Sequence, residues 1–334
     1  MPLRSVFAAL ACVVLIACGG GGGDAPPADP VEQVPDTPGL REAVREARTP
    51  DPASFPEPEG KSLQQIADLV KAGPQAALAT TVLTTGESRL TFGLIGQDGR
   101  PIYGPTAVYV ARTPADPAQG PFVAPADVLL TQDRYKSKQA ATETDPFAAV
   151  YAADLEFERA GGWSVLVATR SRGQLVGAPT QVTVATKEAD EIPDVGERAP
   201  RVSTDTLDSV KGDRDLLDTR DPPSDMHADF ADVVGKKPVA LLFATPQLCQ
   251  SRVCGPVTDI ALQLRAKYGE RMEFIHQEVF VDNDLGKGLR PPLEAFKLRT
   301  EPWLFVIDKR GRVTARLEGS FGVEAFEAAV KTGL

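Results

Sequence analysis

Two cysteines in one short loop constrain this chain more than any other feature of its sequence. The apolar run Val239–Thr245 predicts a buried strand, and the loop after it carries Cys249 and Cys254. A helix start follows, because Gly255 can serve as the N-cap and Pro256 suits the first helical position, where a missing N–H costs nothing. We therefore expect a strand, a loop with two thiols and a helix in direct succession.

The spacing of the two cysteines restricts where each of them can lie. On one helix, residues five apart would be about 7.5 Å apart along the axis and roughly 140° apart around it, which a disulfide does not tolerate. Cys249 must therefore lie in a bent loop, while Cys254 stands one residue before the helix, where the macrodipole stabilises a thiolate. Such a small ring contributes only about 2 kcal/mol to stability in the chain-entropy model. Thiol–disulfide exchange explains this pair better than stapling does.

The elements predicted for residues 199–334, after an acidic linker at 187–198, include strands and helices in alternation. The segments that predict strands are Val239–Thr245, Met272–Val279, Trp303–Asp308 and Val313–Leu317, and those that predict helices are Pro256–Tyr268, Pro292–Leu298 and Val323–Lys331. This βαβαββα order, with the cysteine loop after the first strand, is that of the α/β thioredoxin fold.

Short motifs in the same region carry a resemblance to a known family. They are Ala199-Pro200, residues 230–245, Cys254-Gly255-Pro256 and Thr300-Glu301-Pro302-Trp303. Together they resemble the thioredoxin superfamily over about residues 197–334, in particular its extracytoplasmic, membrane-tethered branch. The resemblance implies a thiol–disulfide oxidoreductase that uses Cys249 and Cys254 without a cofactor and acts on protein thiols or disulfides of the cell envelope. It also implies that Pro302 is a cis-proline that helps to bind the substrate polypeptide.

The chain departs from the family pattern in two ways. The family motif is Cys-x-x-Cys, whereas this chain has Cys-x4-Cys. Either Cys254 matches the first cysteine and Cys249 is its partner from the loop, or Cys249 matches it and the motif is lengthened; the helix-start position favours Cys254 as the thiolate. The acidic residue that thioredoxin buries beneath its cysteines falls at Leu241 or Leu242 here, so we expect that proton relay to be missing.

The N-terminus predicts export and a lipid anchor. Arg4 precedes about a dozen apolar residues, which is too short for a membrane span and typical of a secretory signal over residues 1–18. Leu15-Ile16-Ala17-Cys18-Gly19 resembles the lipobox of bacterial lipoproteins. The resemblance implies that Cys18 is lipidated and holds the protein on a membrane of the bacterial cell envelope, outside the cytoplasm. A plain signal peptide with an incidental cysteine is the alternative.

The segment between the signal and the first domain is rich in glycine and proline. Such composition predicts a disordered tether over residues 19–60. One short helix is expected after it, because Leu63, Ile66, Ala67 and Val70 stand at helical spacing.

Residues 75–186 predict a second, all-β domain. About seven short strands separated by turns such as Asp98-Gly99 and Gly161-Gly162 suggest an immunoglobulin-like β-sandwich. The region has no cysteine, so only the broad sandwich class is implied. Trp163 is expected to anchor its core. No catalytic constellation is present, and we expect a spacer or docking module.

Other functions fit less well or remain open. The net charge of −10 and the lack of a basic stripe disfavour nucleic acid as a partner. A non-catalytic envelope binding protein with a permanent disulfide is the main alternative. A copper-handling protein would need His227 or His276, which we expect in a solvated loop and a strand respectively, so no metal site is assigned. A peroxiredoxin-like protein would use Ser251 before Cys254, but the family's proline would fall on Gln247.

Overall fold

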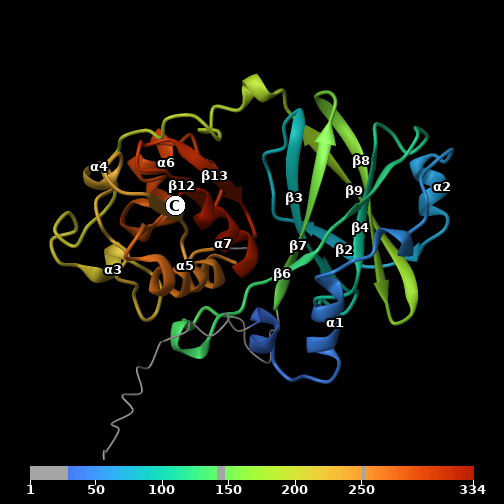
Figure 1. Ribbon diagram of the computed structural model, residues 1–334, viewed down its shortest axis with the longest axis horizontal. Coiled ribbons are helices and arrows are strands. Elements are labelled where there is room, and N and C mark those ends of the chain that lie inside the picture. Colours follow the sequence, from blue (N-terminus) through green and yellow to red (C-terminus); the bar gives the residue numbers. More distant parts are fainter. Residues whose placement is uncertain (1–28, 141–146, 250–252) are drawn as a thin grey trace, which may run out of the picture.

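The computed structural model describes residues 29–140, 147–249 and 253–334, and its described part consists of two halves. An α/β half and a β half lie side by side (Figure 1). The signal sequence and the predicted lipid attachment at Cys18 lie outside the described residues. Among the described residues, no helix combines the length and the apolar character that crossing a membrane requires.

Two sheets build the β half. One sheet has the strand order β1-β9-β8-β4-β5, and the other has the order β2-β3-β7-β6. The strands are β1 (Lys71–Ala72), β2 (Gln75–Leu78), β3 (Gly86–Ile95), β4 (Thr106–Ala111), β5 (Gln119–Val123), β6 (Ala126–Val128), β7 (Ala149–Phe157), β8 (Gly161–Ser171) and β9 (Gln174–Val184).

The two sheets share one apolar core, as a sandwich requires. Phe92 of β3 and Tyr151 of β7 pack in the same cluster as Val165 of β8. Trp163 is buried there and meets Phe157 edge to face at 5.1 Å between ring centroids, so its predicted role as a core anchor is confirmed. Two packed sheets are thus present, whereas the immunoglobulin-like class stays a prediction.

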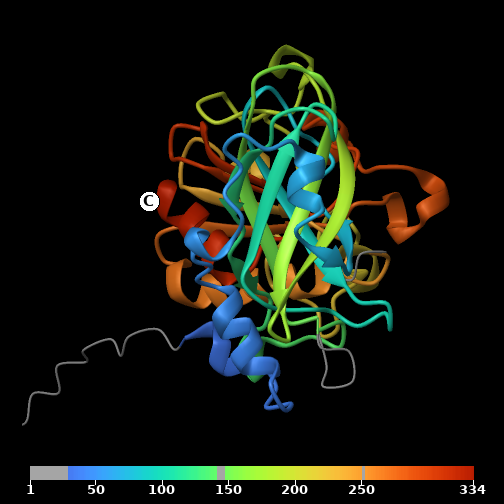
Figure 2. The same ribbon diagram turned by 90° about the vertical axis from the view of Figure 1, so that its right-hand side faces the viewer.

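The predicted disordered tether is wrong for residues 29–60. These residues form η1 (Pro30–Gln33), α1 (Leu40–Ala47) and η2 (Pro52–Ser54), and α1 lies against the β half (Figure 2). Val31 and Val44 are fully buried in the core of the β half. The average composition of this segment suggested that the entropy cost of ordering it would not be offset. Burial of a few apolar side chains against the β half offsets that cost. The expected short helix is α2 (Leu63–Ala67), which begins with a capping box.

The α/β half has the predicted order of strands and helices. Its sheet has the order β11-β10-β12-β13, in which β10 runs parallel to β11 and antiparallel to β12. The elements are α3 (Arg214–Leu217), α4 (Phe230–Val233), β10 (Val239–Phe243), α5 (Cys254–Tyr268), β11 (Glu273–Gln277), η5 (Val281–Asn283), η6 (Leu285–Lys287), α6 (Pro291–Ala295), β12 (Trp303–Ile307), β13 (Val313–Glu318) and α7 (Val323–Thr332); η3 (Asp133–Tyr135) and η4 (Lys187–Ala189) lie outside this half.

Helices cover both faces of this sheet. Leu242 of β10 packs with α5 and α7 on one face, whereas its neighbour Leu241 packs with α4 and α6 on the other. A strand covered on both sides must be apolar throughout, which explains the uninterrupted run Val239–Phe243. β10 is therefore a fixed support for the cysteine loop that follows it.

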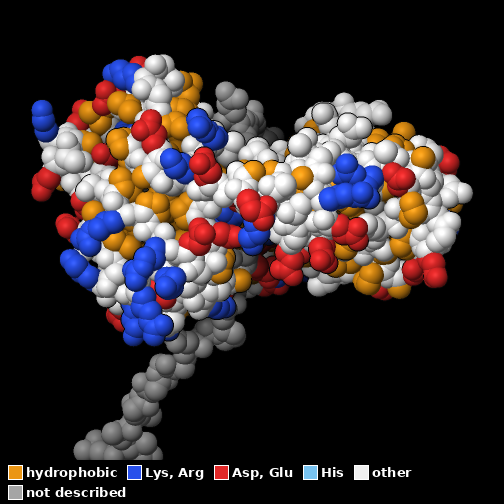
Figure 3. Space-filling view, turned by 90° about the horizontal axis from the view of Figure 1, so that it is seen from above, with side chains coloured by type: hydrophobic (Ala, Val, Ile, Leu, Met, Phe, Trp, Pro, Cys, Tyr) orange, Lys and Arg blue, Asp and Glu red, His pale blue; other side chains and the backbone are white. Residues whose placement is uncertain are grey.

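Buried polar contacts join the two halves. The Asp127 carboxylate of β6 accepts hydrogen bonds from the backbone N–H groups of Gly322, Glu324 and Ala325 at 2.9–3.0 Å, so the β half caps helix α7. On the face shown in Figure 3, acidic and basic side chains both occur, and several basic side chains gather at its lower left.

Candidate functional site

The structure pairs Cys249 and Cys254 as a disulfide. Their Cα atoms are 6.0 Å apart, within the range that a disulfide allows. The loop bends as expected, because the N–H of Cys249 donates to the carbonyl of Thr245 at 3.0 Å. Residues 250–252, including Ser251 of the peroxiredoxin-like hypothesis, lie outside the described residues.

The helix that carries Cys254 begins earlier than predicted. Cys254 is the first residue of α5 and Val253 is its N-cap, so the prediction of Gly255 as N-cap and Pro256 as first residue is wrong. The difference is within the fraying that helix ends allow, and Pro256 still lies in the first turn, where its missing N–H costs little. Cys254 remains at the positive end of the helix.

The two sulfurs differ in exposure. Cys254 is fully buried, whereas Cys249 is only partly buried. The β half is one reason, because a Cβ atom on Gly255 would come within 2.7 Å of the Gln139 side chain. The Gln139 segment therefore lies directly on the first turn of α5. Of the two cysteines, Cys249 is the one that a second protein could reach.

Pro302 directly precedes β12, the strand that pairs with β10. The Glu301–Pro302 peptide is cis, so the predicted cis state is confirmed. Trp303 opens β12 and pairs in register with Phe243, the last residue of β10. The start of β12 and the cysteine loop consequently meet at one edge of the sheet.

Glu301 is a site residue that the sequence analysis missed. Its carboxylate oxygen and the two cysteine sulfurs all lie within 4.8 Å of one another. Burial, and then the negative charge of Glu278, raises the pKa of Glu301. The positions on β10 that correspond to the buried acid of thioredoxin, Leu241 and Leu242, are buried and apolar, as predicted. Its position directly before the predicted cis-proline is the sequence signal that could have indicated Glu301.

A second polar cluster lies behind the cysteine loop. Asp218 is buried, and its carboxylate is 3.1 Å from His227 Nε2 and 3.5 Å from His276 Nδ1. Burial alone would lower the pKa of His276, but the charge of Asp218 raises it to about 9. Burial alone would raise the pKa of Asp218, but His276 and His227 hold it well below its usual range.

The two histidines differ in how well their positions were predicted. His276 is buried on β11, the strand in which it was predicted, with Nε2 3.0 Å from the carbonyl oxygen of Ala244. The prediction of a solvated His227 is wrong, because its side chain is only 10% exposed and faces Asp218. The loop that carries His227 folds onto β11, which its polar composition did not indicate.

Thr219 connects this cluster to the loop that carries Cys249. Its N–H and hydroxyl donate to the Glu278 carboxylate at 2.7 Å each, and the hydroxyl oxygen accepts from the N–H of Gln247 at 3.1 Å. Burial raises the pKa of Glu278. A continuous set of polar groups therefore runs from Asp218 to the residue two before Cys249.

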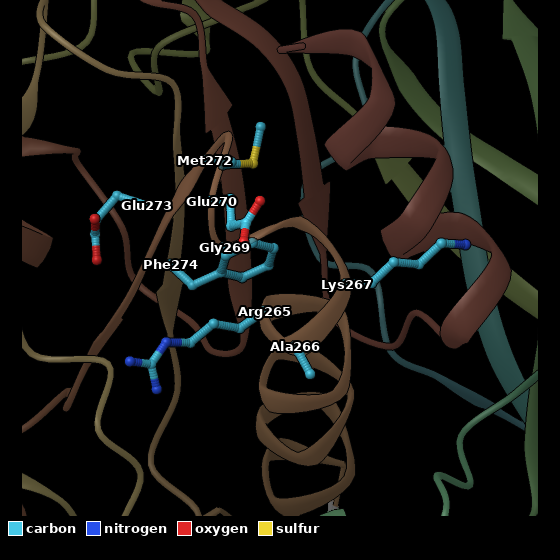
Figure 4. A pocket seen from close by; sticks show the side chains of 8 residues that line it. All are labelled: Arg265, Ala266, Lys267, Gly269, Glu270, Met272, Glu273 and Phe274. Atoms are coloured by element: carbon cyan, nitrogen blue, oxygen red, sulfur yellow. The ribbon is translucent and has the colours of Figure 1, made fainter. Parts of the chain in front are cut away.

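Another hollow lies far from the disulfide. It encloses about 500 Å³ at the C-terminal end of α5 and is lined by Arg265, Lys267 and Glu273, among others (Figure 4). Arg265 is eleven residues after Cys254 on the same helix, which is about 16 Å along the axis. With no cysteine or histidine in its lining, this hollow contributes nothing to the chemistry of the site.

Comparisons with known proteins give a partial likeness. No protein-family model matches the chain, and no curated protein matches it. Among solved structures, a thiol:disulfide interchange protein of the thioredoxin family from Chlorobium tepidum TLS is 20% identical, covering 43% of this chain and 99% of its own, with a TM-score of 0.29. A thioredoxin-like protein in the oxidized form is 19% identical, covering 30% and 78%, with a TM-score of 0.24. These TM-scores are too low to carry an argument, so the function proposed below rests on the geometry of the site.

Proposed function

We propose that this chain is a thiol–disulfide oxidoreductase of the bacterial cell envelope. The observation that carries the proposal is the Cys249–Cys254 disulfide with the Glu301 carboxylate within 4.8 Å of both sulfurs. Exchange needs a reachable thiol, a nearby resolving thiol and a group that handles the proton. The three side chains match these three requirements.

The difference in burial supports Cys249 as the attacking cysteine, in place of the sequence-based preference for Cys254 as the thiolate. In the reduced protein the Cys249 thiolate attacks a substrate disulfide, forming a mixed disulfide and releasing one substrate thiolate. Cys254 then attacks the Cys249 sulfur, which restores the internal disulfide and releases the second substrate sulfur. Two electrons pass from the dithiol to the substrate, and the same steps run backwards when the protein oxidises a dithiol.

Glu301 handles the proton of the buried thiol in this scheme. Cys254 must lose its proton before it attacks, and it is out of reach of bulk water. The Glu301 carboxylate accepts that proton and then returns it to the departing substrate thiolate. Pro302, adjoining Glu301 at the start of β12, is proposed to bind the substrate polypeptide.

The anchor and the β half complete the proposed function. Lipidation at Cys18 would hold the protein on the extracytoplasmic side of a membrane, where protein thiols and disulfides are its partners. The β half, proposed as an immunoglobulin-like sandwich, serves as a spacer that also covers the first turn of α5 through Gln139.

A second function is favoured by one observation. Cys254 is fully buried beneath the β half, as a permanent structural disulfide would be, so the thioredoxin-like half would then be a platform for binding. The redox potential distinguishes the two functions. A value near those of dedicated exchange proteins supports catalysis, and a value well below about −300 mV supports a structural disulfide.

An exchange assay tests the proposal directly. Reduced protein should reduce insulin disulfides, and a variant with both Cys249→Ser and Cys254→Ser should not exceed the rate of reductant alone. Equal rates for the two proteins, together with a disulfide that resists strong reductant in the folded state, would reject the oxidoreductase in favour of the platform.

A further inference from the structure

We propose that Asp218, His227 and His276 bind one divalent transition-metal ion, with Zn²⁺ as the first candidate. The ligand atoms of the three side chains all lie within 4.8 Å of one another. The site is separate from the disulfide and does not depend on the function proposed for it.

Backbone carbonyl groups fix which nitrogen of each ring carries a hydrogen. His276 Nε2 lies 3.0 Å from the carbonyl oxygen of Ala244, and His227 Nδ1 lies 3.3 Å from the carbonyl oxygen of His276. A carbonyl oxygen can only accept, so both of these ring nitrogens donate. In a neutral imidazole the other nitrogen then has a lone pair and no hydrogen.

Both remaining nitrogens face the same carboxylate. His276 Nδ1 is 3.5 Å from Asp218 Oδ1, and His227 Nε2 is 3.1 Å from Asp218 Oδ2. A cation must balance this carboxylate: either the two rings carry protons there, or a metal ion displaces those protons and binds both nitrogens. His276 Nδ1 is buried and makes no hydrogen bond of good geometry among the described residues, as expected of a nitrogen that binds a metal ion.

The distances suit a small metal ion. Zinc binds imidazole nitrogen and carboxylate oxygen at about 2.0–2.2 Å, which places tetrahedral ligand atoms roughly 3.3 Å apart. The separations of 3.1 Å from His227 Nε2 to Asp218 Oδ2 and 3.5 Å from His276 Nδ1 to Asp218 Oδ1 lie on either side of that value, each to a different oxygen of the carboxylate. Two imidazoles and one carboxylate, without sulfur, favour a divalent ion over Cu(I).

The groups around the three ligands are arranged as in metal sites. A histidine ligand usually donates its second N–H to a carbonyl or carboxylate, which orients the ring, and both rings here do so. The Asp218 carboxylate is held by the N–H and hydroxyl of Ser224, at 2.7 Å each, and by the N–H of Arg220 at 2.9 Å. The three ligands are therefore already in position.

Only one side of the cluster is open. Asp218 and His276 have side chains that are at most 1% exposed, whereas that of His227 is 10% exposed. An ion would enter past His227, and a water molecule would complete its coordination from that side. Because Thr219 links Asp218 to Gln247, a bound ion would also stiffen the start of the cysteine loop.

Metal titration of the full chain tests the site. The oxidised protein is used so that the cysteines do not compete, and Zn²⁺ is added against a chromophoric chelator. We expect one ion per chain, and more than about tenfold weaker binding in His227→Gln and in His276→Gln. Glu301→Gln is the matched control, because it removes an acidic group beside the disulfide and should leave zinc binding unchanged.

Two further measurements keep the outcome decisive. X-ray absorption of the zinc-loaded protein should show nitrogen and oxygen ligands and no sulfur. Ser224→Ala, which keeps all three ligands, should weaken zinc binding without unfolding the protein, as circular dichroism would verify. Zinc binding that is absent, or equal in the wild type and His227→Gln, overturns the proposal. Nitrogen chemical shifts of two imidazolium rings in zinc-treated protein would also overturn it and show that protons hold the cluster together.

Discussion

The two polar clusters at this edge of the sheet differ in how they meet solvent. The cluster of Cys249, Cys254 and Glu301 has one partly exposed sulfur, so a second protein can reach it. The cluster of Asp218 and the two histidines is almost closed, so only a proton or a small ion can enter. Under the functions proposed above, the first cluster exchanges bonds with a partner, whereas the second holds charge in place.

The largest expected effect separates the two cysteines of the open cluster. Cys254→Ser leaves the reachable thiol without its resolving partner, so this variant should accumulate a mixed disulfide with a substrate protein. Cys249→Ser leaves only the buried thiol and should trap none. Mass spectrometry after mixing each reduced variant with an oxidised substrate measures the difference. Trapping by Cys249→Ser alone would reverse the assigned roles.

The next largest effect concerns the closed cluster. Asp218→Ala removes the carboxylate between the buried ring of His276 and the partly buried ring of His227, and should lower the free energy of unfolding by about 3–5 kcal/mol. Guanidinium unfolding followed by tryptophan fluorescence measures it. Asp225→Ala, on the same loop but exposed, is the control and should change stability by no more than about 0.5 kcal/mol. If Asp218→Ala lowered the free energy of unfolding no more than Asp225→Ala does, the cluster would not contribute to stability.

A third effect tests the proton role of Glu301. Glu301→Gln should slow exchange roughly 100-fold, because the amide cannot accept the Cys254 proton. Burial and Glu278 raise the pKa of Glu301, so the carboxylate forms only above the usual range, and the rate should rise with pH through that raised pKa.

The pH dependence of the exchange rate is measured from about pH 4 to 8 in the wild type, in Glu301→Gln and in the control Glu294→Gln. The step should be absent from Glu301→Gln, which keeps the charged and titratable neighbours Glu278, Cys249 and Cys254. Glu294→Gln, an exposed substitution on α6, should retain it. An unchanged step in Glu301→Gln would assign the ionisation to another group.

The smallest effect tests the cover over the open cluster. Gly255→Ala places a Cβ atom 2.7 Å from the Gln139 side chain and should cost about 1–3 kcal/mol of stability. It should also speed alkylation of Cys254 in the Cys249→Ser background, since the β half is pushed off the helix. Gly162→Ala, where a Cβ atom meets nothing within 4 Å, is the control. Unchanged alkylation would mean that the β half does not protect this thiol.

Local patterns in the sequence were sufficient for much of the α/β half. The order of strands and helices, the bent cysteine loop and the cis peptide before Pro302 were all predicted and are present. Each depends on periodicity, turn chemistry or short motifs, which act over a few neighbouring residues. The predicted start of α5 is two residues too late, because Val253 rather than Gly255 is its N-cap.

Contacts between distant segments account for what the sequence did not show. Val31 and Val44 are buried only because the β half offers them a surface, so composition alone suggested disorder. Glu301 is 47 residues from Cys254 in the chain, and only the pairing of β12 with β10 brings that strand beside the cysteine loop.

The sequence by itself determined that two thiols follow a buried strand and precede a helix, because hydrophobic period and helix-end chemistry are local. Only the tertiary structure decided which sulfur is reachable, which carboxylate lies beside it and that two histidines share Asp218. Burial and side-chain proximity depend on how elements from different parts of the chain pack, and no local pattern records that packing.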